Sequence, residues 1–368
     1  MKKTKIETLI ERHERLREDG LNLIASENKL LDEAKRALSS DLSGRYHSDY
    51  YGGTEVIREI MERTEKMAER VFGVEHAFIK PVSGNICDLN VLFSFTDPED
   101  SVAMIPYDNG GYPLGLEKFD RERIDIPTEE DSYEIDIEMA EEVYRGDAPD
   151  LTILGASYIP FPHPVEAISE FMSEKDRPLV YDGSHVLGLI ATGEFQSPLE
   201  EGADILIGST HKSFYGPQGG LILTDRDEYA EEIRRYQDID LETGIGLVDN
   251  PHVNRIAALG ITLEAMLEDP GYGDRVVKNA KTLASSLEKN GVPIKFAEKG
   301  YTESHQIFID MEWERSKEFC ELLEKEKIFI DITGRIGVAE VTRRGMDESD
   351  MQDIAEKIAE VYGGFGAK

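Results

Sequence analysis

One lysine follows a stretch of sequence that reads as a buried strand. Residues 204–212 (DILIGSTHK) place an apolar run before a short polar turn that ends at Lys212, and the glycine-rich residues 216–220 (GPQGG) come next. In a partly desolvated pocket a lysine loses its charge more readily, and its neutral amine then attacks an aldehyde to form a Schiff base. We therefore predict that Lys212 is a nucleophile that carries a cofactor. The alternative is a solvated loop lysine.

A second polar turn follows the apolar run at 179–181. Residues 181–185 (YDGSH) bring Asp182 and His185 to the end of that predicted strand. Because neighbouring parallel strands end at the same edge of a sheet, Asp182 and Lys212 are expected to meet there. Pyridoxal 5′-phosphate (PLP) is an aldehyde cofactor that uses both groups, since a carboxylate keeps its pyridine nitrogen protonated. Taken alone, Asp182 could be a capping aspartate and His185 a packed core histidine.

Short apolar segments alternate with helical ones along the chain, which predicts a mostly parallel sheet covered by helices. At 368 residues, two packed domains are the natural expectation. We predict an interface arm at 1–55, a large cofactor-binding domain at 56–248 and a small C-terminal α/β domain at 249–368. The expected strands are 101–105, 151–154, 179–181, 205–207, 221–223, 307–309 and 328–330. The expected helices are 7–19, 30–38, 55–72, 227–236, 253–267, 276–289 and 347–362.

Taken together, these motifs resemble the serine hydroxymethyltransferase family. The matching segments are 23–28 (LIASEN), 50–53 (YYGG), Ser83 with Gly84, Asp182 with His185, 210–212 (THK), 335–337 (RIG) and 341–345 (VTRRG). The resemblance implies an α/β fold of the fold-type I PLP-dependent kind, with a mostly parallel seven-stranded sheet in the large domain. It also implies a homodimer whose active sites are shared between subunits.

The resemblance assigns roles to individual positions. Around the cofactor, Ser83, Gly84 and Asn85 would hold the phosphate at a helix start, and Ser157 and His185 would contact the side of the ring that carries the phenolic oxygen. His211 belongs to the matching turn beside Lys212. Around the amino acid substrate, Arg335 and Ser26 would bind the carboxylate, and Tyr51 would reach in from the partner subunit. The alternatives are a surface ion pair for Arg335 and a core position for Tyr51.

Three positions depart from the family pattern. Ser43 stands where the family has a glutamate that handles protons in the folate-dependent step, and a hydroxyl does not exchange protons near neutral pH without help. Asn109 stands where a histidine stacks on the cofactor ring, so the stacking becomes an amide contact. Residues 244–248 (GIGLV) stand where the family has a loop with paired glycines that reaches the phosphate from the neighbouring subunit. The substitute proton handlers would be Glu27, His47 or Asp49.

Charge and composition exclude several classes of partner. Acidic residues outnumber basic ones 75 to 41, giving a formal net charge of -34, which disfavours nucleic acid and anionic membranes. We expect no secretory signal and no membrane span. With two cysteines, Cys87 and Cys320, we expect no metal site and no disulfide scaffold, which fits a reduced cytosol.

Three functions fit these observations. The first is hydroxymethyl transfer between serine and glycine, with a tetrahydrofolate-type or modified pterin as the one-carbon carrier. The second is a carrier-free aldolase that acts on threonine-like or 2-substituted 3-hydroxy amino acids. The third is a PLP-binding protein that has lost turnover, against which the carboxylate clamp at Arg335 argues.

Overall fold

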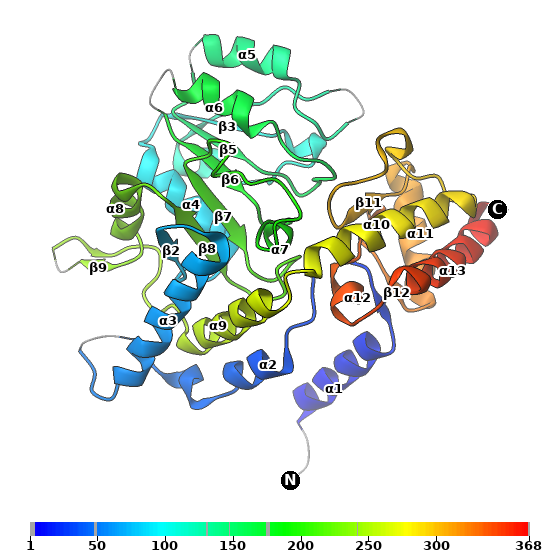
Figure 1. Ribbon diagram of the computed structural model, residues 1–368, viewed down its shortest axis with the longest axis horizontal. Coiled ribbons are helices and arrows are strands. Elements are labelled where there is room, and N and C mark those ends of the chain that lie inside the picture. The colour runs from blue at the N-terminus through cyan, green and yellow to red at the C-terminus, as the bar shows by residue number, and fades with distance from the viewer. Residues whose placement is uncertain are drawn as a thin grey trace. The chain divides into compact units, whose positions relative to one another are not determined.

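The computed structural model describes residues 4–47, 50–129, 132–146, 148–173, 177–240 and 242–366. The chain packs into two compact units (Figure 1). We call them the sheet unit, Leu30–Gly273, and the terminal unit, which joins Met1–Lys29 to Asp274–Lys368. The division of the sequence at 1–55, 56–248 and 249–368 uses other boundaries, and it stays a prediction about domains.

The sheet unit is built on a seven-stranded sheet with the order β2-β8-β7-β6-β5-β3-β4. β8 runs antiparallel to both of its neighbours, and the strands from β7 to β4 are parallel. The strands are β2 (His76–Phe78), β3 (Ser101–Met104), β4 (Glu122–Asp125), β5 (Leu151–Leu154), β6 (Leu179–Asp182), β7 (Ile205–Ser209) and β8 (Gly220–Thr224). The expected fold class is confirmed, as are the five strands predicted for this part of the chain.

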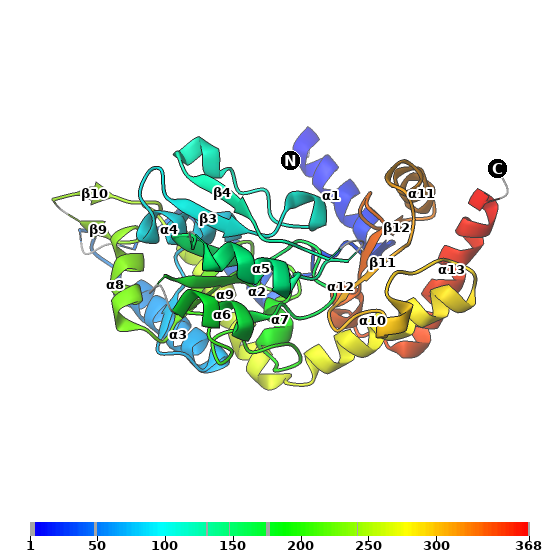
Figure 2. The same cartoon turned by 90° about the horizontal axis from the view of Figure 1, so that it is seen from above.

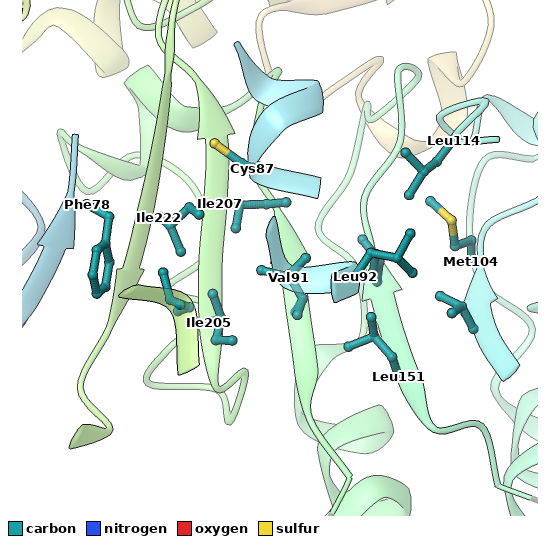
Figure 3. Packing of buried hydrophobic residues seen from close by; sticks show 14 of the residues in the cluster. Phe78, Cys87, Val91, Leu92, Met104, Leu114, Leu151, Ile205, Ile207 and Ile222 are labelled. Atoms are coloured by element: carbon teal, nitrogen blue, oxygen red, sulfur yellow. The ribbon is translucent and has the colours of Figure 1, made fainter. Parts of the chain in front are cut away.

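Successive side chains of a strand point to opposite faces of the sheet, and each face packs against a layer of helices. α4 (Gly84–Phe95) covers one face, and Figure 3 shows its Cys87, Val91 and Leu92 among strand residues such as Leu151 and Ile207. Thr152, next to Leu151, is reached by helices that pack against each other, α5 (Ile137–Arg145) and α6 (Val165–Ser173). The Tyr144 hydroxyl of α5 lies 3.2 Å from the Thr152 hydroxyl. The sheet is therefore covered on both faces, as its apolar strands predict.

Three helices form a further layer of the sheet unit, α2 (Asp32–Leu38), α3 (Glu55–Phe72) and α9 (Val253–Glu268), and they lie together in Figure 1. α3 buries residues at helical spacing, namely Ile57, Met61, Thr64 and Ala68. It ends at Gly73, whose φ of 67° is accessible to glycine at little cost. The remaining elements are η1 (Asp41–Gly44), η2 (Tyr107–Asn109), η3 (Leu116–Phe119), α7 (Leu187–Ile190), α8 (Asp227–Arg235), β9 (Ile239–Asp240) and β10 (Gly244–Ile245).

The terminal unit joins the two ends of the chain through strand pairing. β1 (Leu21–Asn22) pairs in parallel with β12 (Ile328–Phe329), and β11 (Gln306–Phe308) pairs antiparallel with β13 (Arg335–Gly337). Figure 2 shows helices of this unit around the short strands. The helices are α1 (Lys5–Glu18), α10 (Tyr272–Lys289), η4 (Ala297–Lys299), α11 (Trp313–Lys325), α12 (Ala339–Arg343) and α13 (Glu348–Gly366). All seven helices predicted from the sequence are confirmed, with shifts of a few residues at their ends. None of the described helices combines the length and apolar composition that a membrane crossing needs.

Candidate active site

The ends of β6 and β7 bring Asp182 and the Lys212 turn to one edge of the sheet. Asp182 lies opposite Ile207 in the parallel register, and Lys212 is half-buried in the turn five residues further along the chain. Thr210 N donates to Gly219 O at 3.1 Å, which closes that turn onto the start of β8. Asp182 is 8% exposed, and its Oδ1 accepts the Ser184 N–H at 2.9 Å. The predicted meeting of these two strand ends is confirmed.

The first turn of α4 packs directly against the same strand ends. A Cβ atom on Gly84 would overlap Ser209 Oγ and lie 3.2 Å from Ser184 Oγ, so a larger residue would require the Ser209 side chain or the helix to shift. Ser83 is the N-cap, and its Oγ accepts the Ile86 N–H at 3.2 Å. Asn85 is exposed, and its Oδ1 accepts the Tyr112 hydroxyl at 3.1 Å. A capped helix start with backbone N–H groups fits a phosphate.

The loops after β3 and β5 close another side of this edge. A Cβ on Gly155 would lie 2.6 Å from the Asp182 Cβ, so the loop that carries Ser157 packs against Asp182. Ser157 N donates to Gly110 O at 2.6 Å, and Asn109 Nδ2 donates to Ser132 O at 3.3 Å. The sheet unit thus gathers Asn109 and Ser157 on loops that meet beside Asp182.

Two histidines lie at these strand ends. His211 precedes Lys212, and burial together with the lysine charge lowers the pKa of His211 to about 4, so the ring is neutral near pH 7. Its Nδ1 is buried and has no hydrogen-bond partner among the described residues. His185 is 5% exposed and sits three residues after Asp182. A buried carboxylate, a neutral imidazole with an unpaired nitrogen, a half-buried lysine and a capped helix start together fit PLP.

The terminal unit holds Arg335, Ser26 and Glu27. Arg335 is 7% exposed on β13, and its Nε donates to Asp331 Oδ2 at 2.6 Å. The alternative of a surface ion pair is correct in that Arg335 pairs with Asp331, but it is wrong in placing the pair on the surface, because Arg335 is buried. A Cβ on Gly337 would overlap Ala25, so the segment that carries Ser26 lies against β13. This packing brings the two proposed carboxylate contacts onto adjacent segments.

The proposed proton handlers have different surroundings. Glu27 is ion-paired with Arg17 of α1 and accepts the Asn22 side-chain amide at 3.4 Å. His47 is half-buried at the end of the loop after η1, whereas Asp49 lies outside the described residues. Ser43 is exposed in η1, between Asp41 and Arg45, which form a bidentate ion pair. Glu27 and His47 are thus the candidates within the described ranges.

Tyr51 is 55% exposed, and its ring centroid lies 5.6 Å from that of Tyr46. The alternative that Tyr51 is a core residue is therefore wrong. Gly246 follows the exposed strand β10, and a Cβ on it would overlap Tyr236 O. The altered glycine loop thus keeps one glycine for a close backbone approach.

Several residues of the site were missed from the sequence. They are Gly155 and Ser184, which contact Asp182, and Ser209, which contacts the start of α4. These contacts form between segments distant in the sequence, so no local sequence pattern predicts them. Asp88 is 2% exposed in the apolar helix α4, and an acid in such a helix is a signal that could have been used.

Comparisons with known proteins agree over the whole chain. The family model described as serine hydroxymethyltransferase matches residues 1–358. The serine hydroxymethyltransferase of Methanothermobacter marburgensis is 37% identical, over 97% of this chain and 89% of that protein. The serine hydroxymethyltransferase of Thermococcus kodakarensis is 35% identical over the same shares. Among solved structures, an L-threonine transaldolase from Pseudomonas fluorescens superimposes with a TM-score of 0.89 at 25% identity, covering 98% of this chain and 87% of that one.

Proposed function

The chain belongs to the serine hydroxymethyltransferase family, and from that premise we propose that it moves a hydroxymethyl group between serine and glycine with a pterin carrier. The family establishes the coarser statement, that the protein is a PLP-dependent enzyme that makes or breaks the Cα–Cβ bond of a 3-hydroxy amino acid. The particular amino acid and the tetrahydrofolate-type pterin are the proposed parts.

The observation that carries the proposal is the shared edge of β6 and β7, where Asp182 and the Lys212 turn lie. Bound PLP supplies an electron sink for the carbanion that forms at the substrate Cα. Lys212 would bind the cofactor through its side-chain amine. Asp182, held by the Ser184 N–H, would keep a proton on the pyridine nitrogen, and the start of α4 would hold the phosphate.

Arg335 would orient the amino acid by its carboxylate. Its Nε donates a hydrogen bond to Asp331, and this bond fixes the plane of the guanidinium group. Ser26 would contribute a hydroxyl to the same carboxylate. A fork held in this way would bind the substrate carboxylate in one orientation, which is the task of a positioning residue in this chemistry.

The proton-handling group of the pterin-dependent step differs from the family pattern, because Ser43 is a hydroxyl. We propose that Glu27 or His47 takes over. Glu27 is held in place by its ion pair with Arg17, so its carboxylate has a fixed position. His47 is a candidate by its residue type, since histidine has the ordinary pKa nearest to neutral pH.

We propose further that the protein is a cytoplasmic homodimer that shares its active sites. Tyr51 and the hairpin residue Ile245 are both more than half exposed, and they lie on the two loops that the family resemblance assigns to the neighbouring site. A partner subunit would cover both. Size-exclusion chromatography with light scattering tests the assembly, and mixing Tyr51→Phe protein with a Lys212→Ala protein tests the sharing through the activity of hybrid dimers.

The deciding experiment records the visible spectrum of the PLP-loaded protein with glycine, serine and allo-threonine, each with and without a pterin. A new long-wavelength band with glycine that grows when the pterin is added supports the proposal. Acetaldehyde released from allo-threonine with no response to the pterin would instead identify a carrier-free aldolase. The carrier-free aldolase is the second candidate because the chain is similar to an L-threonine transaldolase and has Ser43 at the position of the family's glutamate. No spectral change with any amino acid would point to a PLP-binding protein without turnover.

A further inference from the structure

A second buried carboxyl group lies near the proposed cofactor carboxylate, one helix turn after Gly84. Asp88 is on α4, 2% exposed, and its Oδ1 has no hydrogen-bond partner in the part of the chain that the structure describes. Asp88 follows Gly84 by four residues, so both occupy one face of the helix. Gly84 packs against Ser209 and Ser184. That face therefore looks toward the segment whose Ser184 N–H holds Asp182.

The charged and titratable groups around Asp88 come from several elements. Burial raises the pKa of Asp88 well above its usual range, the nearby Asp182 carboxylate raises it further, and Lys212 opposes them with a smaller effect. Burial and then Asp88 and Asp182 also raise the pKa of Tyr112. The thiol of Cys87, on the same helix, has its pKa raised by burial and by both carboxylates. Asp88 thus lies in a low-dielectric region close to Asp182, where a negative charge on Asp88 is disfavoured.

We propose that Asp88 keeps its proton at neutral pH and is a positioning residue for Asp182, so that the two carboxyl groups share one proton and one negative charge. The inference rests on the proposed role of Asp182 toward the cofactor. The single negative charge of the two carboxyl groups would balance the positive charge of a protonated pyridine nitrogen. A second charge would be buried without a partner, which proteins avoid. The protonated Asp88 would donate to the Asp182 carboxylate, while Ser184 N–H holds the other side.

The first test needs neither substrate nor cofactor. Infrared spectra of the full-length, cofactor-free protein are compared at about pH 7, where an ordinary aspartate is ionised. We expect the carbonyl band of a protonated carboxylic acid in the wild type, shifted by 13C-labelled aspartate and absent from Asp88→Asn. Cys87→Ala perturbs the same helix turn without removing a proton, and it should keep the band. A wild type without the band, or an Asp88→Asn protein that retains it, overturns the proposal.

The second test separates positioning from bulk packing. PLP binding is titrated in Asp88→Asn, which has a hydrogen-bond donor, and in Asp88→Leu, which keeps the branched shape without a donor. Asp88→Asn should bind PLP within about threefold of the wild type, and Asp88→Leu about 10- to 100-fold more weakly. Equal affinity in Asp88→Leu, or the larger loss in a folded Asp88→Asn, overturns the positioning role. Because the infrared band requires no reaction, a protein without transferase activity that still shows the band would count against the proposed function alone.

Discussion

Gly155 lies so close to Asp182 that a Cβ atom on the glycine would stand 2.6 Å from the aspartate Cβ and 2.6 Å from its carbonyl oxygen. Real Cβ atoms do not approach so closely, so one of the two segments would move. The segment that follows β5 thus packs directly against Asp182, and this close packing is possible because Gly155 has no side chain. Asp182 is positioned by this contact and by the hydrogen bond from Ser184.

Gly155→Ala is therefore expected to weaken PLP binding and to destabilise the protein by about 1–3 kcal/mol, the usual cost of overpacking. PLP titration and denaturant unfolding measure the two effects. The matched control is Gly363→Ala on α13, where nothing lies within 4 Å of an added Cβ, and it should be neutral or slightly stabilising. Unchanged PLP affinity in Gly155→Ala would show that the carboxylate tolerates displacement.

Lys212→Ala is expected to abolish turnover and the visible absorption of protein-bound PLP, because the side chain would no longer offer an amine to the aldehyde. Absorption spectra after gel filtration check the cofactor, and single-turnover assays check the reaction. Lys118→Ala, which removes an exposed lysine, should leave both unchanged. A Lys212→Ala protein that kept the wild-type band would move the cofactor to another lysine.

The sheet and its chemistry were predictable because β6 and β7 are apolar runs that end in polar turns. That pattern predicts Asp182 and Lys212 at one edge of the sheet, and the register of Asp182 opposite Ile207 confirms it. The strand pairing between the two ends of the chain was harder to predict from the sequence. Residues 21–22 form a two-residue strand with β12, and a segment of that length carries no periodic signal.

The supporting residues were beyond prediction because their roles depend on tertiary packing. Gly84 and Gly155 look like turn glycines in the sequence, yet each leaves room for a neighbour across the sheet edge. The partner of Arg335 was hidden for a different reason. Asp331 lies four residues earlier on a turn, so the buried pair resembles an ordinary local charge pattern until its burial is known.

Ser43→Glu tests whether the missing glutamate limits the pterin-dependent step. A carboxylate at this position is expected to raise pterin-dependent turnover by about tenfold or more, since it exchanges protons where a hydroxyl does not. Ser43→Gln, which has the same length and does not titrate, is the control and should leave turnover unchanged. If Ser43→Ala abolishes turnover, the serine itself carries the function and Glu27 and His47 lose their proposed role.

His163 is expected to make the protein acid-sensitive. Burial lowers the pKa of His163 to about 4, below its value of about 6.5 in an unfolded chain. Below about pH 6.5 the unfolded state therefore binds a proton that the folded state does not, and stability is lost as the pH falls toward 4. The loss is about 2 kcal/mol between about pH 7 and pH 5. Thermal unfolding of cofactor-free His163→Gln should depend less steeply on pH than the wild type, and an equal slope would contradict the assignment.

Arg335→Ala is expected to raise KM for glycine and serine by about 10- to 100-fold while leaving PLP affinity unchanged, because the proposed clamp would contact the amino acid and not the cofactor. Arg335→Lys should recover little, since an ammonium cannot replace the planar fork. Asp331→Asn discriminates further. If Asp331 orients the guanidinium through Nε, its amide variant should raise KM less than Arg335→Ala and leave kcat nearly constant. A fall in kcat with KM unchanged would place Arg335 in the chemical step instead of in substrate binding.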